Sequence, residues 1–241
     1  AYLTIDRDLQ AAVEASLENT VRGIPTCNSG AAIVLDVKTG DVLAMASYPT
    51  FDLNSFADGI SASEWASVQA DNPRDPFSAA PLYNNATKAS AAPGSTFKPI
   101  TGLVALECGL NPNLKIWDKG HIDIGGRSFG CYTWNEYKRT DGYEDLEWGI
   151  GNSCNYYFAC IATGKNWGNG ASLGYNKEIT IDAIIQRAKD LGLGEKTGIE
   201  IGETVREPVS KESKMKSYKV AVWNAIYNKA HVYFPKSVYD N

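Results

Sequence analysis

A serine and a lysine stand three positions apart in Ser95-Thr96-Phe97-Lys98. On a helix this spacing places both side chains on one face, close enough to exchange a proton. Pro99 fits the first turn of such a helix, because the N–H that proline lacks would have no partner there. We therefore predict a helix that begins at about Ser95, with its hydroxyl at the positive end of the helix dipole, where an anion is stabilised. Taken alone, the tetrad more often indicates a capping serine on a surface helix, with Lys98 in water.

A second pattern, Ser153-Cys154-Asn155, opens another predicted helix over residues 153–163. By itself this tripeptide fits a serine or asparagine N-cap. The two patterns together are more specific, because S-x-x-K followed by S-x-N is typical of acyl-transferases with a serine nucleophile. A hydroxyl attacks a carbonyl once a base has taken its proton, and a neutral lysine can be that base. The candidate catalytic residues are therefore Ser95, Lys98, Ser153 and Asn155.

The hydrophobic pattern predicts the elements that would position these residues. Apolar residues recur every four positions over 6–21 and predict a helix, which Thr4 or Asp6 could cap. Two β-type runs, 31–37 and 41–48, flank Lys38-Thr39-Gly40 and predict a hairpin. Further predictions are a short helix around 61–70, a helix from about 95 to 109, short strands within 115–135 and a helix over 180–190. The long segment 49–92 is typical of functional loops, and the lysine-rich run 210–219 of a solvated surface segment.

The composition argues against several other classes of protein. The chain has 241 residues and a net charge of −5, so we expect no nucleic-acid partner. No apolar run approaches the ~18 residues of a membrane helix. The five cysteines form no C-x-x-C pair, and His121 and His231 lie far apart in the chain. This spacing predicts no metal site and no cofactor.

Pro93-Gly94-Ser95-Thr96-Phe97-Lys98-Pro99 resembles the nucleophile motif of the penicillin-binding transpeptidases. Residues 4–10 are similar to a T-I-D-x-x-L-Q motif of that family, and residues 36–54 resemble a segment of its class B, monofunctional members. Residues 193–203 resemble its later block of G-L-G, T-G-I and G-E. These matches keep the family's order over residues 3–203. The chain thus resembles the transpeptidase domain of a class B penicillin-binding protein, a monofunctional peptidoglycan D,D-transpeptidase.

The family's third motif, K-[ST]-G on a strand facing the nucleophile, has no good match. Lys38-Thr39-Gly40 is the predicted hairpin turn, and Lys196-Thr197-Gly198 continues into Ile199 where the family usually has threonine. We expect both to be chance matches. We also expect residue 1 to follow a cut, and the chain to stop before the third motif and the last strands. One oxyanion donor would then be absent, which typically costs about 10²–10³ in rate.

The resemblance implies the α/β (α+β) penicillin-binding fold, an antiparallel sheet flanked by helices with a mostly helical lobe that carries the nucleophile. We expect one transpeptidase domain over residues 1–241. Its sheet subdomain would take about 1–50 and 190–241, and its active-site lobe about 80–190.

The resemblance also implies an activity. Ser95 would attack a peptidoglycan stem peptide at D-Ala-D-Ala, with Lys98 as base and Ser153 as relay to the leaving amine. Asn155 would hold the Lys98 side chain and the substrate amide. β-Lactam antibiotics are a second implied ligand, and cell-wall synthesis proteins are implied partners. Because this substrate lies outside the cytoplasm, we expect a membrane anchor upstream of residue 1 and a place on the extracytoplasmic face of the bacterial cell membrane.

Three other functions stay open at this point. The first is a relative that binds β-lactam or peptidoglycan without turnover, as a sensor or scaffold. The second is a β-lactamase-like hydrolase, for which no deacylating carboxylate can be assigned. The third is a thiol enzyme built on Cys154 and His121. Cys131 and Cys154 also suggest a redox switch that blocks the site, whereas Cys108 and Cys160, on predicted helices, fit inert packing.

Overall fold

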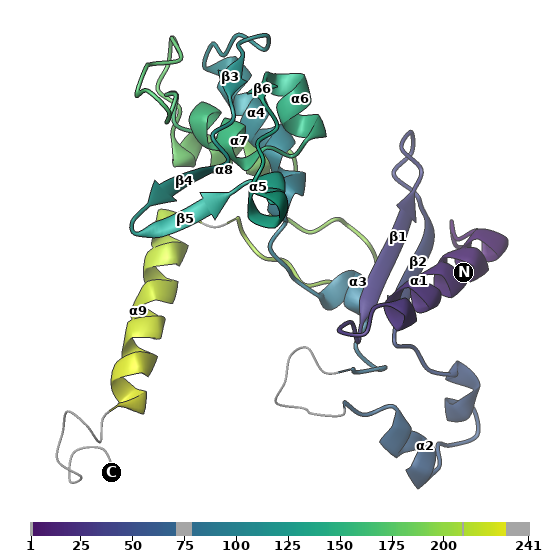
Figure 1. Ribbon diagram of the computed structural model, residues 1–241. Helices are drawn as coiled ribbons and strands as arrows, with labels where there is room; N and C mark the ends of the chain where they lie inside the picture. The colour runs from purple at the N-terminus through teal and green to yellow at the C-terminus, as the bar shows by residue number, and fades with distance from the viewer. Residues whose placement is uncertain (1, 71–78, 209, 230–241) are drawn as a thin grey trace. The chain divides into compact units, whose positions relative to one another are not determined.

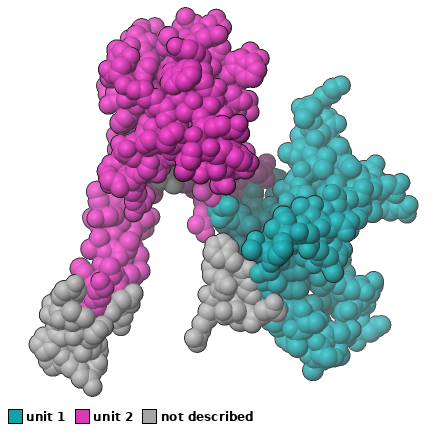
Figure 2. Space-filling view, viewed as in Figure 1, with its two compact units in different colours: residues 1–91, 198–204 teal, residues 92–197, 205–241 magenta. Residues whose placement is uncertain are grey.

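The computed structural model describes residues 2–70, 79–208 and 210–229 (Figure 1). The chain divides into two compact units (Figure 2), unit 1 with residues 1–91 and 198–204 and unit 2 with residues 92–197 and 205–241. His231 lies outside the described residues. In the described part of the chain, no helix combines the length and the apolar character that crossing a membrane requires.

Unit 1 is built on a helix and a two-stranded hairpin. Helix α1 (Arg7–Gly23) begins where the Asp6 side chain accepts hydrogen bonds from two backbone N–H groups of its first turn, as an N-cap does. Strands β1 (Gly30–Leu35) and β2 (Val42–Tyr48) pair antiparallel. Gly40 in the turn between them has a φ of +81°, which glycine adopts without strain. The predicted helix and hairpin are both confirmed.

Helix α1 packs along β2, and one side chain joins them. The Gln10 carboxamide accepts from the Met45 N–H (2.8 Å) and donates to the Met45 carbonyl (2.9 Å). Val21 on the helix and Ala44 and Ala46 on the strand are buried. The core of unit 1 is therefore a thin apolar layer between one helix and one strand.

The irregular segment 49–92 contains three short helices: η1 (Leu53–Phe56), α2 (Ala62–Ser67) and α3 (Asn85–Lys88). The short helix predicted around 61–70 is confirmed as α2, which starts with a capping box between Ser61 and Glu64. Residues 198–204 return to unit 1, where the Thr204 N–H donates to the Thr87 carbonyl at 2.8 Å.

Unit 2 carries most of the helices, together with two small antiparallel ladders, β3 with β6 and β4 with β5. Its elements, in chain order, are η2 (Gly94–Phe97), α4 (Lys98–Glu107), β3 (Ile116–Trp117), β4 (His121–Ile124), β5 (Arg127–Gly130), α5 (Tyr132–Tyr137), β6 (Tyr143–Glu144), α6 (Leu146–Gly151), α7 (Asn155–Ile161), α8 (Ile181–Asp190) and α9 (Lys211–Asn228).

Helix α7 forms the centre of unit 2. Its residues Tyr156, Tyr157, Phe158, Cys160 and Ile161 are all buried. They form one cluster with residues of α4, the turn after it, β3 and β4, namely Ala105, Leu110, Ile116 and Ile122. A second cluster joins Val104 and Cys108 to Ile184 of α8. Cys108 and Cys160 are thus buried in apolar clusters, as the sequence predicted.

The described residues beyond 204 group with unit 2. Two ion pairs connect them to α8, Glu207 with Lys189 (3.5 Å) and Lys211 with Asp182 (2.8 Å). Residues 211–219 of the lysine-rich run are exposed, as predicted, and they belong to the 18-residue helix α9.

Candidate active site

Ser95, Lys98 and Ser153 lie together in unit 2. The Lys98 ammonium donates to the Ser153 hydroxyl (2.9 Å) and to the Ser153 carbonyl. The Ser153 hydroxyl in turn donates to Ser95 Oγ at 2.9 Å. Two motifs far apart in the sequence therefore form one hydrogen-bonded chain from a lysine nitrogen, through one hydroxyl, to another.

The turn before α4 sets the direction of Ser95. The predicted helix does not begin as an α-helix at Ser95, because residues 94–97 form the 3₁₀ turn η2 and α4 starts at Lys98. The Thr96 hydroxyl closes this turn on the Pro93 carbonyl at 2.6 Å. Pro99 lies in the first turn of α4, as predicted. Ser95 is exposed and Lys98 half-buried, so the hydroxyl faces solvent while the Lys98 side chain is partly withdrawn from water.

Ser153 has an unusual backbone conformation. Its φ is +54°, in the left-handed region that costs a residue with a side chain about 1–3 kcal/mol. The turn around it is closed by the Cys154 N–H on the Gly149 carbonyl (2.9 Å), while the Ser153 N–H donates to the Ile150 carbonyl (3.1 Å). The preceding side chain, Asn152, donates to the buried Glu144 carboxylate at 2.9 Å.

The start of α7 differs from the predicted serine or asparagine cap. The N-cap is Cys154, whose Sγ accepts from the Tyr157 N–H at 3.4 Å. Helix α7 therefore runs over Asn155–Ile161 and does not include Ser153. Because another residue caps the helix, the Ser153 hydroxyl is available to Ser95 and Lys98.

Burial lowers the pKa of Lys98 from its ordinary value. The physical cause is desolvation, which disfavours the charged ammonium. The Phe158 ring lies 5.5 Å from the ammonium nitrogen and forms part of this partly dry environment. A lower pKa makes the neutral amine more populated at a given pH, and only the neutral amine can take the Ser95 proton.

Asn155 occupies a different position from the one expected. Its side-chain amide donates to the Gly130 carbonyl on β5 at 2.8 Å. The predicted hydrogen bond to Lys98 is not found among the described residues. Asn155 is exposed, so it joins the S-x-N motif to β5 while part of its carboxamide stays open to a ligand.

Two cysteines lie directly behind the motif. Cys131 and Cys154 are free, buried thiols with their sulfurs 3.6 Å apart. The hydrogen bond with Cys131, together with burial, raises the pKa of Cys154, which disfavours the nucleophilic thiolate. His121 stacks on the Trp134 ring, with 5.1 Å between ring centroids. The structure thus pairs Cys154 with Cys131 and the α7 backbone, and gives no support to a thiol enzyme of Cys154 and His121.

The same buried region contains carboxylates. Asp118 accepts from the Cys131 thiol at 3.5 Å, and the ligand atoms of Asp118, Cys131 and Cys154 lie within 4.8 Å of one another. Asp141, Glu144 and Cys154 form a second such group. The residues of both groups come from separate segments of the chain, so the sequence spacing could not show that they lie together.

Neither K-T-G sequence lies on a strand. Lys38-Thr39-Gly40 forms the turn between β1 and β2, as predicted, and Lys196-Thr197-Gly198 follows α8 in an irregular segment. Both are therefore excluded as the strand-borne third motif.

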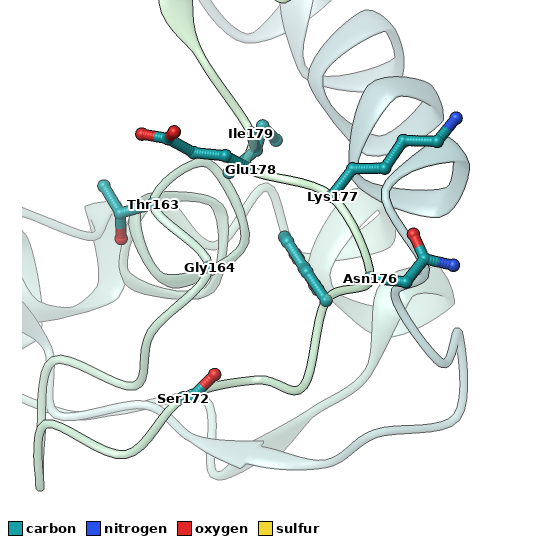
Figure 3. A pocket seen from close by; sticks show the side chains of 8 residues that line it. Thr163, Gly164, Ser172, Asn176, Lys177, Glu178 and Ile179 are labelled. Carbon is teal, nitrogen blue, oxygen red and sulfur yellow. The ribbon is translucent and has the colours of Figure 1, made fainter.

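Unit 2 has two hollows, and a candidate site residue lines only one of the two. One of about 310 Å³, lined by residues between Thr163 and Ile179, contains none of the four candidate residues. Figure 3 shows its Lys177 and Glu178 side chains pointing away from each other, so charged groups do not converge there. A shallow groove of about 580 Å³ includes Asn155 in its lining and lies next to the candidate site.

A serine hydroxyl hydrogen-bonded to a second serine, which is held by a partly buried lysine, is the arrangement of a serine acyl-transferase with a lysine base. Residues 30–221 match the model of the penicillin-binding protein transpeptidase domain, and the chain belongs to this family. Peptidoglycan D,D-transpeptidase MrdA of Haemophilus influenzae is 34% identical over 220 residues, or 90% of this chain and 29% of that protein. The chain therefore spans less than a third of this curated relative.

Solved structures give the same result for the fold. PBP2 of Helicobacter pylori, solved in complex with MreC, has a TM-score of 0.70 at 27% identity over 89% of this chain and 35% of that chain. Penicillin-binding protein A of M. tuberculosis, solved as an imipenem acyl-enzyme complex, has a TM-score of 0.63 at 25% identity, over 87% of this chain and 45% of that one. The predicted mixed fold of helices and sheet, the penicillin-binding fold, is confirmed.

Proposed function

We propose that this chain contributes the nucleophile and the base of a peptidoglycan D,D-transpeptidase of class B. The observation that carries the proposal is the hydrogen-bonded chain from Lys98 through Ser153 to Ser95. The family match and the relative named as a D,D-transpeptidase support it.

In the acylation step, Ser95 Oγ attacks the carbonyl carbon of the penultimate D-Ala of a stem peptide. Its proton passes through the Ser153 hydroxyl to the neutral Lys98 amine, and the Ser95 N–H helps to hold the oxyanion. The intermediate collapses when the C–N bond breaks, and Ser153 returns a proton to the departing amine of the terminal D-Ala. Ser95 then carries the peptide as an ester.

In the second step, an amine of a neighbouring stem peptide attacks this ester. A new amide forms, the Ser95 oxygen leaves, and the proton released by the amine returns to Ser95 through the same hydroxyl. The cross-link therefore forms without a cofactor. A β-lactam would acylate Ser95 by the same first step, in which its ring amide opens, as in the imipenem acyl-enzyme of the M. tuberculosis relative.

The proposal is tested by labelling the full-length protein with a fluorescent penicillin, beside a Ser95→Ala variant. We expect the label on the unsubstituted protein and none on the variant. Equal labelling of both would overturn the assignment of Ser95. Labelling of Ser95 without turnover of a peptide donor would favour the alternative of a binding-only sensor or scaffold.

We further infer that the whole protein acts on the extracytoplasmic face of the membrane, with other cell-wall synthesis proteins. The H. pylori relative solved in complex with MreC supports partners of this kind. Cleavage of the domain in intact spheroplasts by an added protease tests the location, and protection equal to that of a cytoplasmic marker would contradict it.

A further inference from the structure

Glu144 carries a buried carboxyl group that is only half satisfied. It lies on β6 opposite Ile116 of β3, and both residues are buried. One of its oxygens accepts from the Asn152 side-chain amide at 2.9 Å, and the other has no partner among the described residues. A buried polar atom without a partner costs free energy, and an aliphatic side chain would fill the same place without that cost. Packing alone therefore gives no reason for a carboxyl group at this position.

The hydrogen bond of Glu144 connects the two ends of helix α6. Glu144 stands two residues before the helix begins at Leu146, and Asn152 is its C-cap. The next residue is Ser153, whose φ of +54° is unfavourable for a residue with a side chain. A helix of six residues is too short to be stable by itself, so a bond across it restrains both ends. The residue immediately before the strained one is thus held by Glu144.

We propose that Glu144 is a positioning residue for the acylation step, and that it acts through Asn152 to keep the Ser153 hydroxyl in the relay. The inference rests on the proposed function, because it takes this hydroxyl to carry the proton. While Asn152 is held, the hydroxyl keeps its bonds of 2.9 Å to Lys98 and Ser95. Once Asn152 is released, the backbone of Ser153 is free to leave the left-handed region, and the relay loses its geometry.

The surroundings of Glu144 favour its neutral form. Burial raises the pKa of its carboxyl group, and the nearby charges of Asp141, Asp118 and Asp145 act in the same direction. The bond from Asn152 needs only an acceptor oxygen, which a neutral carboxyl group and a carboxamide both offer. Glutamine is therefore the conservative replacement, whereas leucine fills a similar volume and removes the acceptor.

The test measures acylation of the full-length protein by a fluorescent penicillin, as the rate at saturating penicillin and the concentration that gives half of it. For Glu144→Leu, we expect the saturating rate to fall about 10–10²-fold, with the half-saturating concentration unchanged and the denaturant midpoint not lowered. Glu144→Gln should keep most of the rate. Asn152→Ala removes the same bond from an exposed position and should reproduce the loss, so the test does not depend on the folding of Glu144→Leu.

A second comparison places Glu144→Leu in a Ser153→Gly background. Little further loss of rate is expected there, because the hydroxyl that Glu144 positions is already absent and glycine adopts the left-handed conformation without strain. Losses that multiply would show that Glu144 acts independently of the Ser153 hydroxyl, and they would overturn the proposal.

Thr133→Val is the matched control. The Thr133 hydroxyl donates to the Asp141 carboxylate at 2.9 Å, so this variant also removes one hydrogen bond to a carboxyl group of unit 2, but not one that leads to Ser153. It should acylate at the unsubstituted rate. An unchanged rate in Glu144→Leu and Asn152→Ala, or an equal loss in Thr133→Val, would overturn the role of Glu144 alone. Absence of acylation in the unsubstituted protein would instead overturn the proposed function, and the inference with it.

Discussion

Helices α1 and α7 begin in opposite ways. At α1, the polar residue before the helix does what its type predicts, since Asp6 accepts hydrogen bonds from two N–H groups of the first turn. At α7, the serine before the helix bonds no backbone N–H of the helix. Cys154 takes the cap, and Ser153 is turned by its left-handed backbone toward Ser95 and Lys98.

In the proposed mechanism, this difference keeps the Ser153 hydroxyl available for proton transfer. A serine in an N-cap position satisfies the helix and is of little use as a proton relay, because its oxygen is already engaged. A weaker cap at Cys154 and a strained Ser153 are both unfavourable for stability. Together they allow the Ser153 hydroxyl to bond Lys98 and Ser95 instead of the helix backbone. Backbone strain of this kind is typical of functional sites.

The largest effect is expected from a substitution of Ser153 that removes its hydroxyl and also relieves its backbone strain. Ser153→Gly removes the relay but suits the left-handed backbone, so acylation by penicillin should fall about 10²–10⁴-fold while the thermal midpoint does not decrease. Lys138→Gly is the matched control, because Lys138 is also left-handed, with a φ of 53°. It should gain similar stability and keep its acylation rate. A fully active Ser153→Gly protein would contradict the relay.

The pH dependence of acylation tests the lysine at the other end of the relay. Burial lowers the pKa of Lys98, and in the proposed mechanism the neutral amine is the active form. Acylation should therefore rise about tenfold per pH unit below this pKa and level off at a pH below the ordinary lysine pKa of ~10.4. Stopped-flow acylation rates between pH 5 and 10 measure this. A rate that falls as pH rises through neutrality would contradict the role of Lys98 as base.

A smaller effect is expected at the turn that holds Ser153. Gly149 is buried, and a Cβ there would lie 2.6 Å from the Tyr157 ring. Gly149→Ala should destabilise the fold by about 1–3 kcal/mol through overpacking, as measured by denaturant unfolding. Gly151→Ala, in the same helix, meets nothing within 4 Å and should be neutral or stabilising. Equal losses of stability in both variants would show that the close packing of α6 on α7 does not cause the destabilisation.

The smallest effect belongs to α1. Asp6→Ala removes the cap and should cost about 1 kcal/mol, seen as a lower thermal midpoint, with the acylation rate per folded molecule unchanged. A loss of acylation comparable to that of Ser153→Gly would mean that the two helix starts do not have the separate roles assigned here.

Helix α1 and the β1–β2 hairpin of unit 1 were predictable because their determinants are local. The four-residue repeat of α1, its cap at Asp6 and the turn at Gly40 all depend on residues close in sequence. In unit 2 the pairing of S-x-x-K with S-x-N predicted the residues that meet, since the chemistry requires both motifs. The left-handed Ser153 was not predictable, because it depends on Gly149 packing on Tyr157 and on Asn152 bonding Glu144.

Other features of the site depend equally on contacts between distant segments. Asn155 bonds Gly130 on β5, and nothing in the spacing of these residues indicates a contact. The same holds for Asp118, Cys131 and Cys154, whose side chains meet in the core of unit 2. Sequence patterns identify which residues can do chemistry, but the packing of α7 determines their partners.

The carboxamide of Gln10 has a consequence for how the sheet of unit 1 can extend. It takes both backbone groups of Met45, while the Asp6 N–H and the Thr4 hydroxyl take the carbonyls of Leu43 and Val42. In effect the start of the chain replaces a neighbouring strand along that side of β2, so a further strand would find these groups already occupied. Along residues 42–45 the sheet can therefore grow only on the β1 side.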